Sequence, residues 1–335
     1  MNSFSFHSAK NGRRRKLKKY LIKRLLQSIP ILIGITIMTF AIMQLAPGNP
    51  MQTMIDPKIS AEEMQRAQEN LGMNDSLPVQ YVTWLKEIAQ GNFGYTVKTG
   101  QSVGGLIVER LPATLLLTGT AFIMAFAIGV PLGVYSATHR YKLPDYVLTV
   151  ISFVGISIPS FFFGLALIFI FALKLGWLPT SGMITVGADY SGFQLFVDYL
   201  KHVTLPAIVL ALPTIAVVMR FTRSSMLEVL NQDFIRTADS KGLSKKVVYL
   251  KHGLRNALIP VITIFGLSIP FLFGGAYITE HIFNWPGMGS LGIQSIVARE
   301  YPVIMALNLF TSILVMSGNL LADVMYAWAD PRIRY

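Results

Sequence analysis

The chain of 335 residues is 53% hydrophobic and only 14% charged, with a mean hydropathy of +0.52. Soluble domains carry roughly 25% charged residues, so this composition excludes an ordinary water-soluble globular protein. The absence of cysteine excludes disulfides, thiol catalysis and cysteine-based metal sites. The five histidines are scattered, with no pair at the spacing of metal ligands, so no metal site is expected.

Positive charge is concentrated at the amino end rather than spread over a nucleic-acid-binding face. Nine of the 29 Lys and Arg residues lie in the first 24 positions, immediately before an apolar run. Membrane proteins keep such charge on the cytoplasmic side. The formal net charge of +12 therefore indicates a membrane partner and not nucleic acid.

Long charge-free stretches predict six membrane spans, since a helix needs about 20 mostly apolar residues to cross the hydrocarbon core. The fourth span carries Pro206 and Pro213, which neighbouring helices can accommodate in a membrane. The first could also be a secretory signal, but its long apolar core without a small-residue cleavage site favours an uncleaved anchor. The expected fold class is an all-α integral membrane protein with six transmembrane helices. The predicted spans are residues 25–45, 113–137, 147–172, 203–219, 259–278 and 303–325.

The distribution of basic residues orients these spans. With both termini cytoplasmic, 21 of the 29 basic residues fall on the inner side, as the positive-inside rule requires. The predicted regions are a basic cytoplasmic amino end (1–24), a first span (25–45), an extracellular subdomain (46–110), a core of five spans (111–326) and a cytoplasmic tail (327–335).

The extracellular subdomain is long enough to hold several short elements. A capping box at Ser60–Glu63 predicts a helix over about 61–71, and Pro78 begins a second helix that Gly91 closes. The turn-rich residues 91–103 suggest a hairpin, and 102–110 a short interfacial helix before the second span. The apolar face of the second helix consists of Tyr81, Trp84, Leu85 and Ile88. The subdomain is either a plain cap or a docking surface for an extracellular partner.

The cytoplasmic segment 220–258 is far longer than a connection between two spans needs, and it holds eight basic residues. Gly242 is placed to end a first helix in the left-handed conformation, Ser244 to cap a second, and Pro260 to end that second helix. The apolar stripes are Met226, Leu227, Leu230 and Phe234 in the first helix, and Val247, Leu250, Leu254 and Leu258 in the second. This pattern favours a helix–glycine–helix hairpin that binds a partner over a charged loop that only sets topology.

Residues 236–244 (RTADSKGLS) and 252–260 (HGLRNALIP) resemble the coupling loop of ATP-binding-cassette (ABC) importer permeases, which reads approximately E-A-A-x3-G-x9-I-x-L-P. Ala238 and Gly242 match that motif, whereas Arg and Thr at 236 and 237 replace its Glu-Ala pair. The departure is similar to the B-type permeases of dipeptide and oligopeptide importers. Further stretches typical of this subfamily are 91–100 (GNFGYTVKTG), 109–118 (ERLPATLLLT), 284–292 (NWPGMGSLG) and 330–335 (DPRIRY).

The resemblance implies a type I ABC-importer permease fold in a bacterial plasma membrane, forming half of a path for di- or oligopeptides. It implies as partners a second, C-type permease, one or two cytoplasmic ATPases and an extracellular substrate-binding protein. Relatives with nearly the same motifs carry nickel chelates or glutathione, so these substrates stay open. The residues expected to couple to the ATPase are Arg236, Thr237, Ala238, Lys241, Gly242, Leu243 and Ser244.

The sequence lacks the chemistry of an energy-coupling enzyme. No glycine is followed by lysine, so the phosphate-binding loop G-x4-G-K-[ST] is absent, and ATP and Mg²⁺ are expected on a partner ATPase. An ion-coupled secondary transporter usually keeps ionisable residues within its spans, where only Asp323 falls, near a cytoplasmic end and able to face water. Such a transporter, and a channel or structural scaffold, are the alternatives from other classes.

A peptide path needs polar side chains within the spans, since peptide backbones must find hydrogen-bond partners there. The candidates are Ser157, Ser160, Ser268, Asn308 and Asn319, with Ser152 and Ser317 as further polar positions. Contact between neighbouring helices is the alternative role of these residues. Glu280, at the outer end of the fifth span, either meets the ammonium end of a peptide or lies in water.

Overall fold

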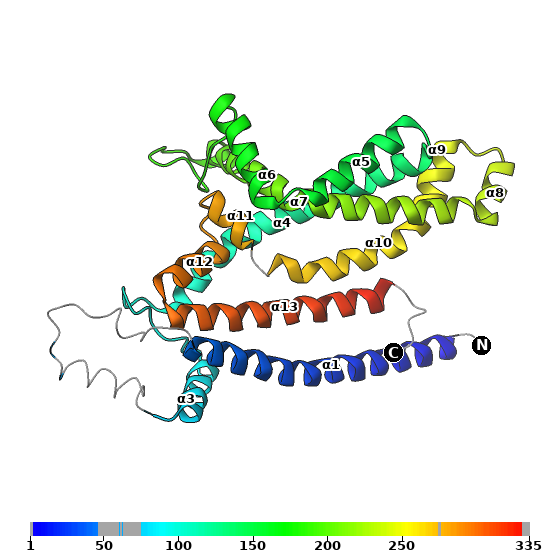
Figure 1. The fold of residues 1–335 in the computed structure, drawn as a ribbon. Coiled ribbons are helices and arrows are strands. Elements are labelled where there is room, and N and C mark those ends of the chain that lie inside the picture. Colours follow the sequence, from blue (N-terminus) through cyan, green and yellow to red (C-terminus); the bar gives the residue numbers. More distant parts are fainter. Residues whose placement is uncertain (1–2, 46–59, 61, 63–74, 274–275, 330–335) are drawn as a thin grey trace.

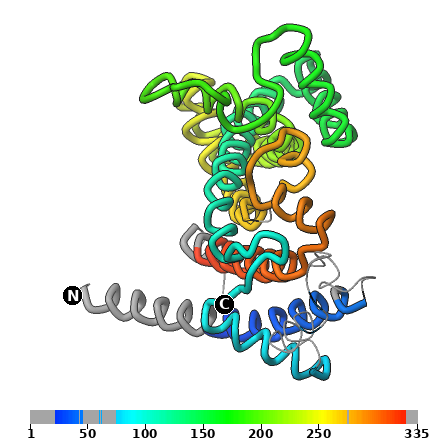
Figure 2. The backbone as a smooth tube through the Cα atoms, turned by 90° about the vertical axis from the view of Figure 1, so that its left-hand side faces the viewer, coloured from blue at the N-terminus to red at the C-terminus, as the bar shows by residue number. Residues whose placement is uncertain are grey.

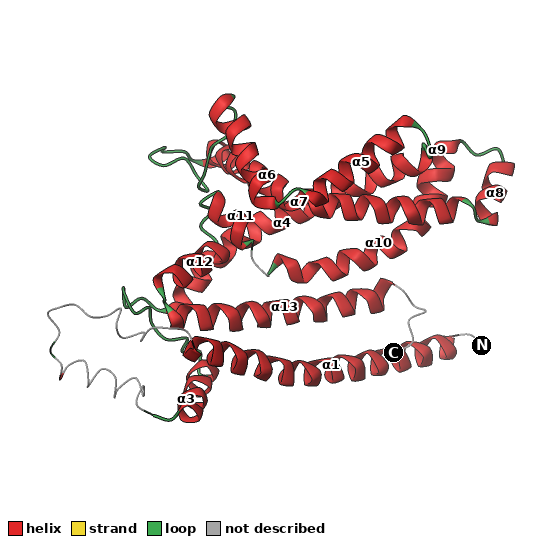
Figure 3. Ribbon diagram, in the orientation of Figure 1, coloured by secondary structure: helices red, strands yellow, loops and turns green. Residues whose placement is uncertain are grey.

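The computed structural model of the protein describes residues 3–45, 60, 62, 75–273 and 276–329. Within these residues the chain is mostly helical and forms no strand (Figure 3). The helices are α1 (Ser3–Leu45), α3 (Leu77–Ala89), α4 (Val103–Thr138), α5 (Leu143–Ser157), α6 (Ser160–Leu167), η2 (Ile168–Lys174), α7 (Gly192–Leu230), α8 (Asp233–Ser240), α9 (Lys245–Val247), η3 (Val248–Leu254), α10 (Arg255–Ser268), η4 (Ile269–Leu272), α11 (Tyr277–Ile282), α12 (Met288–Ala298) and α13 (Tyr301–Ala329). Segments η2 and η3 are π-helical, and η4 is a 3₁₀-helix.

The apolar helices reproduce the predicted spans in number and order. Five stretches of the described chain are long and apolar enough to cross a membrane, and the bent pair formed by α5 with α6 and η2 makes a sixth when it is counted as one span. The predicted all-α fold with six spans is therefore confirmed.

The third predicted span, 147–172, is wrong as a single straight helix. Its two halves differ in direction by 105°. Ile158, between them, is extended (φ −75°, ψ 125°), because the ring of Pro159 clashes with a helical conformation of the residue before it. The bend places α6 away from the line of α5.

The fourth predicted span lies within α7, a continuous helix that passes through both Pro206 and Pro213. α7 packs closely along α4. A Cβ atom added at Gly133 of α4 would lie 2.5 Å from Thr222 Cβ and 2.6 Å from the carbonyl oxygen of Met219. Only glycine permits this approach of the two backbones, so α4 and α7 are in close contact at Gly133.

The second span begins earlier than expected. Residues 102–110 do not form a separate interfacial helix, since α4 runs without a break from Val103 through Pro112. Ser102 is its N-cap, and its hydroxyl accepts a hydrogen bond from the Gly105 amide (3.4 Å). Pro112 lies inside α4, and the helix continues through it although a proline cannot donate the hydrogen bond to the carbonyl four residues earlier.

The second helix predicted within residues 46–110 is confirmed as α3. Its apolar face lies against α1, where the Tyr81 ring meets the Phe40 ring edge-on at 5.5 Å and the Tyr81 hydroxyl shares a 2.8 Å hydrogen bond with Thr36. The predicted hairpin follows as a turn closed by a bridge between Tyr95 and Ser102. The helix predicted over 61–71 lies outside the described residues.

The spans run side by side, with loops gathered at two ends of the molecule (Figure 1). Among the spans, α1 is the outermost, next to α13, in both Figure 1 and Figure 2. The start of α1, the end of α13 and the hairpin of α8 and α9 point toward one end, whereas α3, α11 and α12 lie toward the other. This grouping agrees with the predicted even number of spans.

Candidate functional site

Residues 231–254, within the predicted segment 220–258, form a hairpin that extends from the end of α7 and is called here the coupling hairpin after its predicted role. α8 is followed by a tight turn in which the Gly242 amide donates to the Asp239 carbonyl (2.9 Å). Gly242 has φ +74°, the left-handed conformation that glycine adopts at low cost after a helix. Its predicted place as the residue that ends the first helix is confirmed.

Two other sequence predictions for this segment are corrected. Ser244 stands at the N-cap of the second helix, but its hydroxyl makes no capping hydrogen bond. The second helix does not end at Pro260, which lies inside α10, and the helical path continues to Ser268. The coupling hairpin is therefore joined to the fifth span without a flexible connection.

The buried face of the coupling hairpin is shifted by one residue from the predicted stripe. Ile235 and Ala238 of α8 form a small core with Val248, whereas the predicted Val247 and Leu250 are 37% and 46% exposed. A π-helical turn is wider than an α-helical one, so from Val248 onward the π-helical segment η3 does not follow the 3.6-residue period that the prediction assumes. The hairpin core continues through Leu230 into the packing at its base.

The exposed surface of the coupling hairpin is both apolar and basic. Four large apolar side chains are between 37% and 46% exposed, namely Phe234, Leu243, Val247 and Leu250. Of the seven predicted coupling residues, Ala238 is buried, and the others are exposed: Arg236, Thr237, Lys241, Gly242, Leu243 and Ser244. Lys245 pairs with Asp239 at 2.9 Å across the turn, which braces the tip.

At the base of the coupling hairpin, three helices meet in one core. Ala137 of α4, Met226 of α7 and Ala257 of α10 are buried together. The Ser225 hydroxyl donates to the Ala257 carbonyl (2.9 Å), which ties α7 to α10. The hairpin is thus fixed to the membrane helices through side-chain packing as well as through the chain.

Next to this base lies an ion pair that sequence reasoning missed. Arg223 of α7 donates from Nε and Nη2 to the two carboxylate oxygens of Asp145 on α5, at 2.7 and 2.8 Å. The two residues stand 78 positions apart. A single acid just before one span and two arginines, Arg220 and Arg223, just after another were the only signals in the sequence.

The predicted path residues do not converge on one surface. Ser268 lines a cavity of about 410 Å³ among α4, α7, α10 and η4, where hydroxyls of Thr118 and Thr214 join apolar side chains such as Phe122. The lining residues of this cavity include no acid or base. Ser268 thus lies at a place where an uncharged polar group can meet a ligand, although its own hydroxyl donates to the Ile264 carbonyl (2.8 Å).

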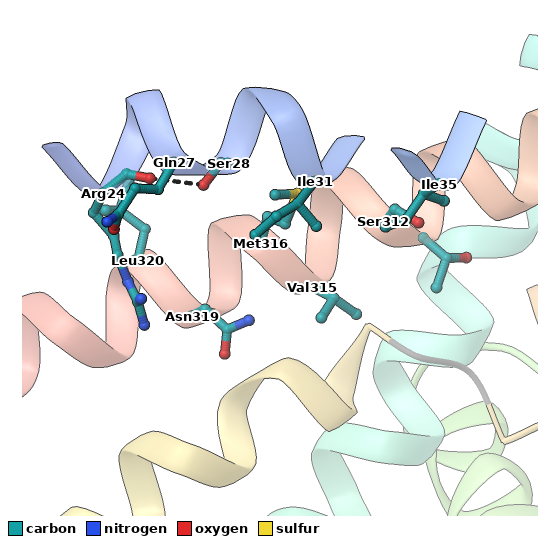
Figure 4. Close-up of a pocket in the computed structure, with 11 residues that line it drawn as sticks. Arg24, Gln27, Ser28, Ile31, Ile35, Ser312, Val315, Met316, Asn319 and Leu320 are labelled. Atoms are coloured by element: carbon teal, nitrogen blue, oxygen red, sulfur yellow. Dashed lines mark hydrogen bonds between the residues drawn. The ribbon is translucent and has the colours of Figure 1, made fainter. Parts of the chain in front are cut away.

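The other hydroxyl and amide candidates lie elsewhere. Ser157 and Ser160 flank the bend between α5 and α6, and the exposed Ser157 hydroxyl donates to the Phe153 carbonyl (2.8 Å). Asn308 is half-buried on α13. Asn319 lines a second cavity, of about 380 Å³, between α13 and α1 (Figure 4).

The intramembrane acid of the sixth span does not face open water. Asp323 Oδ2 accepts a hydrogen bond from Arg24 Nε of α1 at 2.9 Å, and the aspartate side chain is only 14% exposed. This pair joins residues 299 positions apart, which hydropathy alone could not bring together.

Neither sequence expectation for Glu280 holds in the structure, since its side chain is fully buried. Its carboxylate accepts hydrogen bonds from the Thr114 hydroxyl (2.8 Å) and the Ser290 amide (3.0 Å), and burial raises the pKa of this carboxyl. Thr114 in turn accepts from the Met288 amide (2.8 Å), and the Trp285 indole donates to the Ala113 carbonyl (2.8 Å). Two motifs noted in the sequence, 109–118 and 284–292, are therefore joined around Glu280.

A third motif is held at the same end of the molecule. The amides of Val97 and Lys98 donate to the carboxylate of Glu300, at 2.7 and 3.0 Å. This fixes the turn of residues 91–100 against the start of α13. Among the described residues, no three His, Asp or Glu side chains gather as metal ligands do.

Comparison with known proteins gives matches along the whole core of the chain. Residues 129–335 match the family described as "Binding-protein-dependent transport system inner membrane component", and residues 17–118 match the family model of the N-terminal part of such components. The chain is 50% identical over 317 residues to the oligopeptide transport system permease protein AppB of Bacillus subtilis (strain 168), covering 94% of this chain and 99% of that protein.

Other relatives and one solved structure are similar over much of the chain. Identity is 41% over 330 residues to the dipeptide transport system permease protein DppB of Alkalihalophilus pseudofirmus, and 39% over 316 residues to the glutathione transport system permease protein GsiC of Salmonella choleraesuis; each match covers 94% of this chain and 99% of the relative. A chain of the inward-facing MetNI methionine ABC transporter superposes with a TM-score of 0.53 at 17% identity, over 67% of this chain and 96% of that one. This last likeness supports the fold alone.

Proposed function

The chain belongs to the family of binding-protein-dependent transport system inner membrane components, and from that premise we propose that it forms half of the path of an ATP-driven peptide importer. The observation that carries the proposal is the 50% identity, nearly end to end, to a permease named for oligopeptide transport. As a multi-pass protein of the bacterial plasma membrane, it is oriented with both termini and the coupling hairpin in the cytoplasm, which the distribution of basic residues supports.

Coupling to a separate ATPase takes place through the coupling hairpin. Its exposed apolar side chains, Leu243 at the tip and Val247 and Leu250 behind it, are suited to fill a groove on a partner. The exposed cations Arg236 and Lys241 lie beside them and can pair with acidic groups. A surface of this kind on a rigid, cored hairpin transmits displacement, whereas a flexible loop would absorb it.

ATP hydrolysis takes place in a separate subunit in this proposal, which the match to a family of membrane components and the lack of a phosphate-binding loop in the sequence support. When the partner ATPases close on ATP, they push the coupling hairpin. The attached helices then move as rigid bodies and switch the transport path between an outward-open and an inward-open state. A second, C-type permease encloses the other side of the path, and an extracellular substrate-binding protein delivers the peptide to the end that carries α3, α11 and α12.

The cavity at Ser268 is suited to an uncharged or varied peptide. Its hydroxyls can bond to peptide groups, its walls are apolar, and no charged side chain among its lining residues selects for one type of peptide side chain. Glutathione is the second candidate substrate, favoured by the 39% identity to a permease named for its transport.

The experiment is reconstitution of the purified complex in proteoliposomes, with ATP inside, the binding protein outside and radiolabelled peptides of two to five residues. The proposal expects saturable uptake that requires ATP and is insensitive to ionophores. Uptake by the chain alone that collapses with an ionophore would instead support a secondary transporter. Glutathione is tested in parallel as the competing substrate.

A further inference from the structure

A single carboxylate joins three helices beside the base of the coupling hairpin. Asp145 of α5 accepts two hydrogen bonds from Arg223 of α7, one from the Ser136 hydroxyl of α4 and one from the Tyr141 amide (3.0 Å) in the turn between α4 and α5. The aspartate side chain is only 4% exposed. Hydrogen bonds to charged groups are about twice as strong as neutral ones, so this cluster holds the three helices together strongly. The cluster of Asp145, Arg223, Ser136 and Tyr141 is called the junction below.

The turn between α4 and α5 is itself held in a costly conformation by the same carboxylate. Tyr141 has φ +62°, which a residue with a large side chain rarely adopts. Its amide is the one that donates to Asp145 Oδ2. The carboxylate thus fixes the angle between α4 and α5 as well as the distance of both from α7.

The junction is mechanically continuous with the coupling hairpin. Arg223 lies on the last turns of α7, whose end at Leu230 belongs to both the hairpin core and the core at its base. One turn before Ser136, Gly133 lets α4 approach the backbone of α7 closely. When the hairpin is displaced, α4, α5 and α7 are therefore held in fixed positions relative to one another.

We propose that Asp145 is a positioning residue for energy coupling: by holding Arg223, Ser136 and the Tyr141 turn, it makes α4, α5 and α7 move with the coupling hairpin as one rigid body. The proposal rests on the proposed function, in that the hairpin is driven by an ATPase. Without the junction, α7 follows the hairpin while α5, and with it the bend toward α6, lags behind. ATP is then hydrolysed without peptide crossing.

The chain offers a matched control for the loss of a cation. Arg220 lies on the same helix three residues before Arg223, but it is exposed and its guanidinium lies over the Phe153 ring at 5.6 Å instead of on a carboxylate. Arg220→Met therefore removes the same charge and length from α7 without touching the junction. Arg223→Lys keeps the charge and loses the two-pronged geometry that a guanidinium provides.

The first test compares the wild-type complex with Asp145→Asn, Arg223→Met, Arg223→Lys and Arg220→Met in proteoliposomes. Peptide uptake and ATP hydrolysis are measured on the same vesicles with the peptide-loaded binding protein. A coupling free energy of ordinary size predicts a drop of about tenfold in peptides moved per ATP for the Asp145 and Arg223 variants. Arg220→Met is expected to equal wild type. Unchanged stoichiometry in Asp145→Asn and Arg223→Met overturns the proposal.

The second test keeps the proposal falsifiable if those variants do not assemble, and it uses the absence of native cysteine. Two double-cysteine variants carry spin labels at exposed positions. The first, Tyr146→Cys with Lys246→Cys, measures the distance between α5 and the coupling hairpin. The reference variant, Lys246→Cys with Leu321→Cys, measures the distance between the hairpin and α13. On trapping with ATP and vanadate, the 146–246 distance is expected to stay constant while the 246–321 distance changes. A change in the first as large as in the second refutes a rigid body.

The two hypotheses fail in different ways. If the wild-type complex retains no ATPase or imports no peptide, the proposed function fails before any variant is compared. If the wild type imports peptide with ATP and the junction variants do so with equal stoichiometry, only the role of Asp145 is lost.

Discussion

Replacement of Gly242 tests whether the tip of the coupling hairpin must hold its left-handed turn. Gly242 has φ +74°, and a Cβ atom added there would find no other atom within 4 Å. The cost of a substitution within this chain therefore comes from backbone conformation alone and not from a clash with neighbours. This allows a series of variants ordered by their tolerance of that conformation.

The expected magnitudes follow from the backbone preference of each residue. Asparagine visits the left-handed region readily, so Gly242→Asn is expected to cost only a few tenths of a kcal/mol relative to glycine. Alanine pays about 1 kcal/mol and a β-branched valine about 2 kcal/mol. Because 1.4 kcal/mol corresponds to about a tenfold shift in an equilibrium, the native turn in Gly242→Val is depopulated about 30-fold against alternative turns.

The assay is ATP-driven peptide uptake by reconstituted complexes that contain each variant, with assembly checked by size-exclusion chromatography. Uptake per ATP hydrolysed is expected to fall in the order Asn, Ala, Val, with Gly242→Pro also uncoupled, while membrane insertion stays normal. Wild-type coupling in Gly242→Val would refute the role of the turn. Equal loss in Gly242→Asn and Gly242→Val would show that any side chain at the tip interferes, and that backbone conformation is not the cause.

Three further predictions concern the packing beneath the two ends of the molecule. Gly133→Val places side-chain atoms against Thr222 and the α7 backbone, and such overpacking is expected to cost about 1–3 kcal/mol, seen as a lower melting temperature of the detergent-solubilised complex; an unchanged melting temperature contradicts the close α4–α7 approach. Trp285→Phe removes the indole donor to the Ala113 carbonyl and is expected to cost about 1–3 kcal/mol in the same assay, whereas no loss would argue against a buried hydrogen bond. Burial raises the folded-state pKa of Glu280, so the native state keeps this proton to higher pH than the unfolded chain, and stability is expected to fall as the pH rises above about 4.5. Glu280→Gln is expected to flatten that part of the plot of melting temperature against pH. An identical plot in the variant would refute the raised pKa of Glu280.

Hydropathy and charge predict most of the fold because both report on the lipid environment directly. Six apolar stretches become six spans, and the glycine at 242 takes the conformation that its place after a helix predicts. The helix through Pro206 and Pro213 also follows the prediction, since the membrane penalises unsatisfied backbone groups more than a kink. These are local properties, which a short window of sequence contains.

What the sequence could not predict depends on longer-range geometry. Val248 lies in the core, whereas Val247 and Leu250 are exposed, and the π-helical segment η3, which starts at Val248, departs from the 3.6-residue period that a sequence pattern assumes. The bend at Pro159 was readable in principle, but a charge-free run of apolar residues concealed it. The sequence places Glu280 in water or against a peptide, since nothing in a short window around it shows its partners Thr114 and Ser290, which come from separate elements.

In the candidate site, too, the sequence predicts the local features and not the long-range ones. Six of the seven coupling residues are exposed on one hairpin tip because they are neighbours in sequence, and Ala238 alone turns inward. The path residues come from five different helices. Ser268 and Asn319 line two separate cavities, Ser157 and Ser160 flank the bend, Glu280 is buried, and Asn308 is half-buried on α13. Their role as a path stays a prediction, with Ser268 the candidate whose surroundings suit it best.

The most direct test of the central claim is site-specific cross-linking from the hairpin tip to the ATPase. A benzophenone label is attached at Leu243→Cys on the otherwise cysteine-free chain. The matched control is Leu77→Cys, at a position 52% exposed on α3, a helix that lies toward the opposite end of the molecule. In membranes that contain the co-expressed complex, we expect the ATPase to be cross-linked from position 243 and not from position 77. An ATPase cross-linked from position 77, or a labelled and assembled complex that yields no cross-link from position 243, would contradict coupling through this hairpin.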